Sequence, residues 1–244
     1  VGRDREFTQC DADVVGISGE LVEAELLSLY ISVFKRLDID IIIKYNNRNL
    51  MRGLISEVGI EDSKISSVIT IIDKMNKITE AELVKYLVDL GIEEIKVSSL
   101  LLMFKMDLES IKSKFVDSDN EVLKNGIEEI DSLNKYISKL GYNDVCVLDL
   151  TLARGQDYYT GNVFEVYDKS GIVTSSIGGG GRYDKMIGEY INDGEVYPAV
   201  GISFGLTSIF EILKNREEFN KNSNIKIFII PMGVQIEALD LANK

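Results

Sequence analysis

Polar and apolar residues alternate in the first part of the chain. Within residues 5–16, the polar positions Gln9, Asp11 and Asp13 alternate with small or apolar ones, and this period of two predicts a β-strand. One face of the predicted strand therefore carries acid and amide groups. A face of that kind requires a functional explanation.

The following segments switch between helix and strand patterns. Residues 20–37 place apolar side chains at helical spacing, and glutamates near the amino end favour the helix dipole. Residues 40–47, "DIIIKYNN", form a short apolar run that ends at an Asn46-Asn47 turn. This strand–helix–strand order is typical of mixed α/β domains.

Residues 51–140 show a third pattern. Segments with helical spacing, such as "SSVITIIDKMNKI" and "EAELVKYLVDLGI", follow one another with polar links and without a proline. We predict a separate helical module in this part of the chain.

Strand patterns return near residue 145. Apolar or alternating runs predict further strands, which are separated by turn residues and cover residues 145–150, 161–168, 172–181 and 199–205. Residues 225–230 predict a fresh buried strand that opens another βα unit. Together with the polar strand, these segments predict an α+β fold in which helices flank an antiparallel sheet that carries a site.

Composition narrows the class of function. The chain has 244 residues, 45% hydrophobic and 27% charged, which is typical of soluble globular proteins, and no apolar run approaches the roughly 20 residues that a membrane helix needs. It contains no histidine, which removes Ser-His-Asp and Cys-His nucleophilic schemes and histidine zinc sites. The net charge of −13 argues against broad nucleic-acid binding but leaves a local basic site open.

Cysteine content and the start of the chain bear on location. Cys10 and Cys146 are too few and too far apart to indicate a disulfide framework or a metal site. The segment after Val1 has neither the basic nor the apolar region of a signal peptide. We expect a cytoplasmic protein without a membrane span, and we expect an amino-terminal portion to precede Val1.

One polar cluster stands before a predicted strand. The stretch "LARGQDYYTGNVFEVY" places Arg154, Asp157, Tyr158 and Tyr159 between an apolar run and an alternating one. Taken alone, the cluster is as consistent with a solvated loop as with a site.

Glycines mark two further strand ends. The run from Gly178 to Gly181 removes side chains where a ligand can lie against the backbone, although a flexible hairpin end has the same composition. Gly201 and Gly205 stand at a strand-to-helix corner, where close packing of the two elements is the alternative. The three strand ends together favour a shared site.

These segments carry a family resemblance. The motifs "REFTQCDADVVG", "LARGQDYYTGNVFEVY", "SSIGGGGRYDKMIGEY" and "PAVGISFGL" resemble, in order and spacing, the catalytic-domain motifs of histidyl-tRNA synthetases, which are class II aminoacyl-tRNA synthetases. The resemblance covers nearly the whole chain, and the second motif is the histidine-specific signature of the family. It implies ATP-dependent activation of histidine to histidyl-adenylate, with Mg²⁺, and transfer to tRNA(His).

The resemblance also implies roles for single residues. Arg154 would be the catalytic residue, contacting the α-phosphate and the histidine carboxylate. The histidine-binding residues would include the strand side chains, the signature tyrosines and the glycine backbone, namely Gln9, Asp13, Tyr158, Tyr159, Gly179 and Gly180. The ATP-binding residues would be Arg3, Arg154, Gly205 and Ser208, and no metal-ligating residue is assigned.

The chain departs from the family pattern at the third motif. "GLTSIF" places Thr207 and Ser208 where the family usually has an acidic residue and an arginine that reaches the γ-phosphate. A neutral hydroxyl cannot replace that cation, and losing a charge-assisted contact costs roughly 1.5–3 kcal/mol unless another cation substitutes. Gln156 also replaces the usual aliphatic residue of the signature.

Two functions therefore stay open. The first is a histidyl-tRNA synthetase, and the second is a catalytically degenerate paralogue that senses histidine or regulates another protein. The resemblance divides the chain into catalytic domain (1–50), helical insertion (51–140), catalytic domain (141–220) and the start of an anticodon-binding domain (221–244). It also implies a homodimer.

Overall fold

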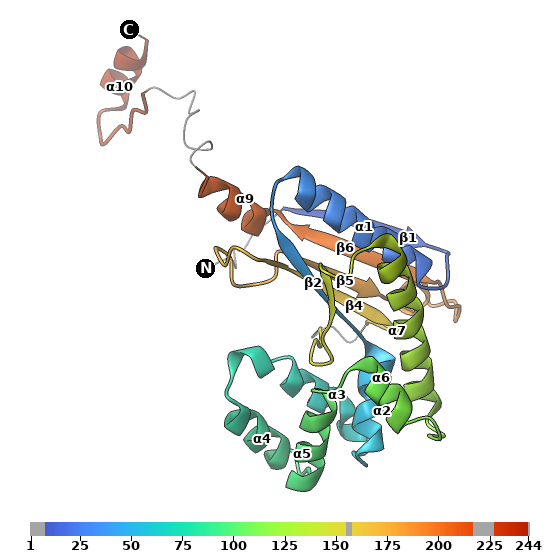
Figure 1. The fold of residues 1–244 in the computed structure, drawn as a ribbon. Helices are drawn as coiled ribbons and strands as arrows, with labels where there is room; N and C mark the ends of the chain where they lie inside the picture. The colour runs from blue at the N-terminus through green and yellow to red at the C-terminus, as the bar shows by residue number, and fades with distance from the viewer. Residues whose placement is uncertain (1–7, 155–157, 217–226, 244) are drawn as a thin grey trace.

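The computed structural model describes residues 8–154, 158–216 and 227–243, and it has the predicted α+β architecture. A six-stranded sheet is flanked by helices (Figure 1). Its strands are β1 (Gln9–Val15), β2 (Ile41–Asn47), β3 (Cys146–Leu148), β4 (Asn162–Asp168), β5 (Gly178–Arg182) and β6 (Ala199–Gly205). The polar face of β1 and the glycine run of β5 thus belong to one sheet.

The strand order is β1-β6-β5-β4-β2-β3, and every pair is antiparallel except β2 with β3. The register places Asp13 opposite Gly201, and it places Glu165 between Gly179 on one side and Lys44 on the other. Since side chains alternate between the two faces of a sheet, this register decides which residues can share a site.

Helices cover one face of the sheet. The two long helices α1 (Leu21–Arg36) and α7 (Glu121–Leu140) contact each other, and they contact β6 and β2 respectively. The ring of Tyr30 packs against that of Phe204 with centroids 4.9 Å apart, and Phe34 is fully buried beside them. Burial of one such side chain stabilises the fold by about 1.5–3 kcal/mol.

The helices between β2 and α7 are short and lie mostly below the sheet in Figure 1. They are α2 (Arg48–Glu57), α3 (Asp62–Ile72), the 3₁₀ turn η1 (Met75–Lys77), α4 (Glu80–Asp89), α5 (Glu94–Met103) and α6 (Leu108–Lys114). A capping box at Thr79 and Glu82 begins α4, and Asn120 accepts the Leu123 amide at 3.1 Å to begin α7. Gly141 ends α7 in the left-handed conformation, at φ 76°.

Glycine lets α2 and α7 approach closely. A Cβ atom on Gly126 would lie 2.1 Å from the backbone nitrogen of Leu50, and one on Gly53 would lie 2.5 Å from the Cα atom of Leu123. The two helices therefore pack backbone to backbone, and α7 also joins them to the sheet through α1 and β2.

Two strand predictions need correction. The strand predicted over 172–181 is confined to Gly178–Arg182, because residues 170–176 form turns and bends that bring the chain back to the sheet. The predicted buried strand at 225–230 is wrong for its described part: residues 227–230 form no strand, and Ile227 and Phe228 are about four-fifths exposed (80% and 78%). An isolated apolar segment has no neighbouring strand to complete its hydrogen bonds.

Three further helices complete the described chain: α8 (Met186–Ile191), α9 (Leu206–Lys214) and α10 (Gln235–Ala242), the last of which lies away from the sheet in Figure 1.

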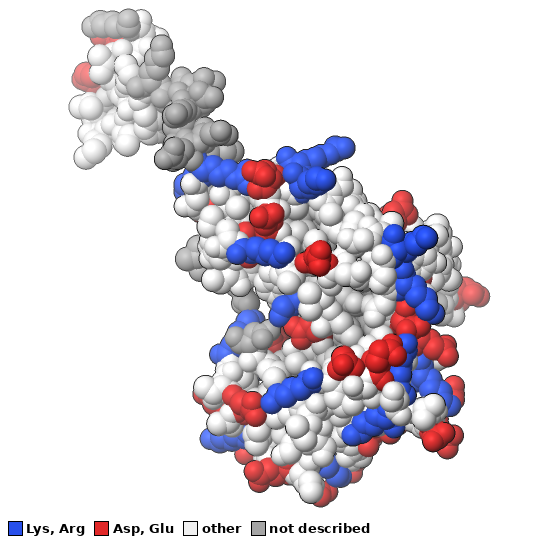
Figure 2. All heavy atoms as spheres, in the orientation of Figure 1, with Lys and Arg blue, Asp and Glu red and all other residues white. Residues whose placement is uncertain are grey.

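Basic and acidic side chains are interspersed over the face shown in Figure 2 and do not gather into a single basic patch there. Among the described residues, no helix is long and apolar enough to cross a membrane.

Candidate functional site

The face of the sheet opposite α1 carries the polar residues. Asp13 and its partner Gly201 lie on this open face, and so does Ser203, which is two residues further along β6. Ser203 pairs with Gly179, Gly179 with Glu165, and Glu165 with Lys44, so these residues share the same face. Their core-facing neighbours, such as Phe164 and Ile43, are fully buried beneath the helices. Strands β2, β4 and β6 thus turn apolar side chains towards the helices, and the opposite face of the sheet carries the polar side chains of a candidate site.

The polar face of β1 is tied to its neighbours by hydrogen bonds. The Tyr183 hydroxyl donates to Asp13 Oδ1 at 2.6 Å, and Gln9 Nε2 donates to Ser203 Oγ at 2.5 Å. Gly201 makes room for the carboxylate, since a Cβ atom there would lie 1.9 Å from Asp13 Oδ1. A carboxylate and an amide are thereby held on an open surface, where they can bind amino or imidazole N–H groups.

The two signature tyrosines lie next to each other above the end of β5. Their ring centroids are 4.6 Å apart, with Tyr158 42% exposed and Tyr159 only 8% exposed. Gly181 accommodates Tyr159, because a Cβ atom there would lie 2.9 Å from the ring. Burial raises the pKa of Tyr159 well above its usual range, so its hydroxyl stays protonated and can donate.

The Arg154 side chain lies across the glycine strand. Its Nη1 atom donates to the Phe164 carbonyl at 3.4 Å and to Glu165 Oε1 at 3.3 Å, and Cζ lies 5.8 Å from the centroid of the Tyr159 ring. A Cβ atom on Gly179 would lie 1.8 Å from Nη1. Only glycine at this position of β5 admits the guanidinium where it stands.

Beyond Arg154 the open face becomes a polar cleft of about 840 Å³. Lys44 Nζ pairs with Asp149 Oδ2 at 2.8 Å and lies 5.6 Å from the centroid of the Tyr167 ring. Burial acts to raise the pKa of Asp149, but hydrogen bonds from Lys44 and Thr151 outweigh it and lower that pKa. The cleft is also lined from the helical side by Asp73 and Lys77, and by Thr174, Ser175 and Ser176 of the turn before β5.

Other predicted site residues lie elsewhere. Gly180 alternates with Gly179 and therefore belongs to the helix-covered face, so only its backbone remains available to the open face. Gly205 ends β6, and its amide donates to the Ile177 carbonyl at 2.9 Å. Ser208 is half-buried in the first turn of α9, and its Oγ atom would lie 3.7 Å from a Cβ atom on Gly205. Arg3 lies outside the described residues.

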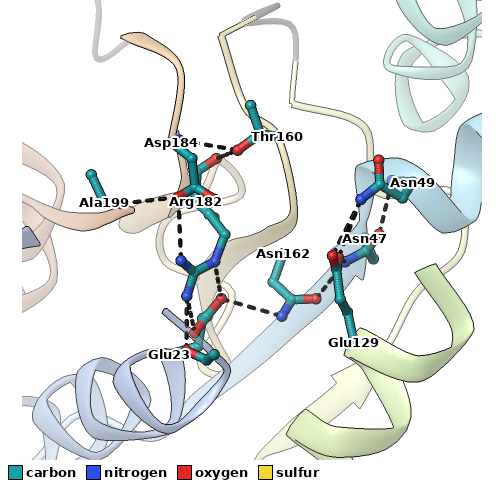
Figure 3. A network of polar contacts seen from close by, with 10 residues as sticks. Glu23, Asn47, Asn49, Glu129, Thr160, Asn162, Arg182, Asp184 and Ala199 are labelled. Carbon is teal, nitrogen blue, oxygen red and sulfur yellow. Dashed lines mark hydrogen bonds and ion pairs between the residues drawn. The ribbon is translucent and has the colours of Figure 1, made fainter. Parts of the chain in front are cut away.

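A buried polar network supports the site from behind the sheet (Figure 3). Arg182 Nη2 and Nε bind the two carboxylate oxygens of Glu23 at 2.7 and 2.8 Å. Asn162 donates to Glu23 at 3.4 Å and accepts from Asn47 at 2.9 Å, and Asn47 also donates to Glu129 on α7. The buried negative charge of Glu23 on α1 and the buried positive charge of Arg182 on β5 thus compensate each other.

The network fixes the chain on both sides of the glycine strand. Thr160, which follows Tyr159, donates its amide to the Arg182 carbonyl at 2.8 Å. Asp184 binds Arg182 Nη1 at 3.2 Å and accepts the Ala199 amide at 2.9 Å. Arg182 therefore has a structural role on the helix-covered face, and its neighbour Tyr183 reaches the open face.

Sequence reasoning did not single out several residues of the open face. Glu165 and Tyr167 lie in the alternating run "VFEVY", and Ser203 lies between two corner glycines. Lys44 interrupts the apolar run of β2. The period of two could have identified Glu165, Ser203 and Lys44, because each is polar between two apolar neighbours. Tyr167 is followed by the polar Asp168, so only its spacing of two from Glu165 places it on the same face.

Fold and site together define a class. The sheet is covered by helices on one face and carries a cation, Arg154, and polar groups on the other. This is the arrangement of class II aminoacyl-tRNA synthetases. Comparison with known families narrows the class further: the family model for histidyl-tRNA synthetase matches residues 1–209. The chain belongs to the histidyl-tRNA synthetase family.

Individual relatives agree with this assignment. Histidine–tRNA ligase 1 of Bacillus cereus is 37% identical over all of this chain, which spans 56% of that relative's length. The crystal structure of histidyl-tRNA synthetase from a Nostoc species has a TM-score of 0.76 and 31% identity, covering 86% of this chain and 51% of that one.

A more distant structure shares the fold. It comes from Bacillus halodurans and is described as an ATP phosphoribosyltransferase regulatory subunit/histidyl-tRNA synthetase. Its TM-score is 0.72 at 20% identity, covering 86% of this chain and 54% of that one.

Proposed function

We propose that this chain forms part of a histidine–tRNA ligase and carries the pocket and the cation that activate histidine with ATP. The observation that supports this most directly is the position of Arg154: its guanidinium lies over Gly179, between the tyrosine pair and Glu165. A fixed cation on an open sheet face stabilises the charge that develops on phosphate oxygens during in-line attack.

The histidine would lie between β1 and the tyrosines. Asp13 would accept from the imidazole, and Gln9 would bind the α-amino group, while Tyr158 and Tyr159 close the pocket. These groups adjoin Arg154, because its Cζ atom lies 5.8 Å from the centroid of the Tyr159 ring. The same ring lies over Gly181, which pairs with the Gly201 that faces Asp13. Activation then requires no protein nucleophile: the carboxylate oxygen of histidine attacks the α-phosphorus atom, and pyrophosphate leaves.

ATP would extend over β5 and β6 towards Gly205 and Ser208. No three acidic, histidine or cysteine side chains gather into a metal site within the described part of the chain. The Mg²⁺ that the family normally uses would therefore be bound mainly through nucleotide phosphates, as is usual for this ion. Arg3 remains a proposed ATP contact.

The wider assembly follows from the family. We propose tRNA(His) as the acceptor, a homodimer as the working unit and the cytoplasm as its location. The division at residues 51, 140 and 221 stays a proposal, with the helical segment as an insertion beside the cleft and the last residues as the start of an anticodon-binding domain.

A second candidate is a paralogue that binds histidine without activating it. Ser208 favours this alternative, because a neutral side chain stands in the first turn of α9, where the family's third motif has its arginine. The intact guanidinium of Arg154 favours the ligase, since a binding protein has no need of a cation placed for the α-phosphate.

Histidine-dependent ATP–pyrophosphate exchange by the full-length protein separates the two functions. The ligase requires exchange that depends on histidine and not on glutamine, followed by charging of tRNA(His). Histidine binding without any exchange would instead establish the sensing role. Equal thermal stabilisation by histidine and glutamine would contradict the pocket in both.

A further inference from the structure

Glu165 stands at the centre of the open face, and neither the family motifs nor the proposed substrate contacts assign it a role. Its Oε1 atom accepts from Arg154 Nη1 at 3.3 Å, while its Oε2 atom accepts from the Tyr167 hydroxyl. Its side chain is 21% exposed and that of Arg154 is 17% exposed. The pair therefore lies at the wall of the cleft and is partly shielded from water.

We propose that Glu165 is a positioning residue that holds the Arg154 guanidinium in the orientation needed for adenylate formation. This inference rests on the proposed function of the same site. Glu165 would act through Arg154 without itself touching the substrate.

The geometry of the guanidinium supports this role. Both the Glu165 carboxylate and the Phe164 carbonyl bind Nη1, and a guanidinium has five N–H donors in a fixed fork. One corner of the fork can therefore be anchored to β4 while the others reach substrate oxygens. The Tyr159 ring limits the side chain from another direction, at 5.8 Å from Cζ.

The anchor is itself held in place. The Tyr167 hydroxyl binds the second oxygen of Glu165, and Lys44 Nζ lies near the Tyr167 ring while it pairs with Asp149. This chain of contacts restrains the carboxylate from the side away from Arg154. A long, flexible arginine side chain that must act in a transition state gains most from such restriction.

Charge and orientation predict opposite effects when Glu165 is neutralised. Loss of its negative charge makes the site more positive, which strengthens the attraction for ATP in the ground state. Loss of the anchor leaves Arg154 mobile, which weakens transition-state stabilisation. A positioning role therefore separates kcat from KM, whereas a purely structural role moves neither and lowers only stability.

The test compares Glu165→Gln with wild type in histidine-dependent pyrophosphate exchange by the full-length protein. We expect kcat to fall about tenfold, with the KM for ATP unchanged or lower and an unchanged melting temperature. Glu93→Gln is the matched control: it also removes a carboxylate that pairs with a cation, Lys96 at 3.1 Å, but on the exposed surface of the helical segment and outside the cleft. It should keep wild-type kcat.

A double-mutant cycle provides the decisive measurement. If Glu165 acts through Arg154, Glu165→Gln in the Arg154→Ala background causes no further loss in single-turnover adenylate formation. An equal loss in both backgrounds, or a raised histidine KM at normal kcat, would overturn the inference. Absence of exchange in the wild-type protein would overturn the proposed function and this inference together, whereas normal kcat in Glu165→Gln with an active wild type would overturn the inference alone.

Discussion

Replacing Gly179 by alanine tests whether the position of Arg154 matters for catalysis. The new Cβ atom would lie 1.8 Å from Nη1, and ordinary van der Waals contact begins at 3.4 Å, so the guanidinium must move by about 1.6 Å. The severe clash is with the end of the flexible Arg154 side chain; the added Cβ atom would also lie 3.1 Å from the carbonyl oxygen of Phe164, which requires a shift of only a few tenths of an ångström in the backbone. A misplacement of about 1 Å can lower a rate by 10²-fold, which corresponds to about 2.7 kcal/mol of transition-state stabilisation.

We therefore expect Gly179→Ala to lower kcat for histidine-dependent pyrophosphate exchange by about 100-fold while the protein stays folded. Gly178→Ala is the matched control on the other face of β5, where a Cβ atom would lie 3.0 Å from Tyr30 Cε1. It should lower the melting temperature and leave kcat near the wild-type value. A Gly179→Ala variant with normal kcat, or equal losses in the two variants, would refute the reasoning.

Three further changes test packing, recognition and electrostatics. Gly126→Ala places a Cβ atom 2.1 Å from the α2 backbone. In urea titrations it should lower the free energy of unfolding by about 1–3 kcal/mol. Unchanged stability would show that α2 and α7 separate easily. Tyr183→Phe removes the hydroxyl that binds Asp13. Since a hydrogen bond is worth roughly 0.5–1.5 kcal/mol, calorimetry should show histidine binding weakened up to about tenfold. A full loss of binding, or no effect, would argue against this contact. Because pairing with Lys44 lowers the pKa of Asp149 in the folded protein, its stabilisation is present at neutral pH and is lost as pH falls through the lowered pKa. Asp149→Asn should thus lower the melting temperature at pH 7 and have no effect in strong acid.

The sequence patterns predicted the sheet where local and tertiary requirements agree. The alternation at Gln9–Val15 and Asn162–Asp168 identified β1 and β4: the half-buried Ala12 and Val14 of β1 and the buried Phe164 and Val166 of β4 pack against the core, and the residues between them face the other way. The glycine run was predicted to let a ligand lie against the backbone; in the structure the Arg154 guanidinium lies over Gly179, and contact with a ligand stays a prediction. The prediction for residues 225–230 failed because an apolar run specifies burial but not the partner strand that would provide it.

Contacts within the site were less predictable. Nothing local indicates that Asp13 binds Tyr183, since 170 residues separate them along the chain. The pairing depends on the register of β1 with β6 and of β6 with β5. The same holds for Arg182, which directly follows the glycine run and gives no local sign of its partner. Its position on the helix-covered face became clear only from its contacts with Glu23.

The place of β1 in the strand order affects how the protein moves. Among the described residues, β1 has a single hydrogen-bonded neighbour, β6, so every second amide of β1 points away from the sheet. Such amides exchange their protons with water through small, local openings. The strand that presents Gln9 and Asp13 is thus one of the two edges of the sheet, the other being β3, and it is less restrained than the inner strands before the substrate arrives. A ligand that joins it to the tyrosines on the far side of β6 would slow this exchange, so binding of the proposed histidine would also tighten the sheet edge.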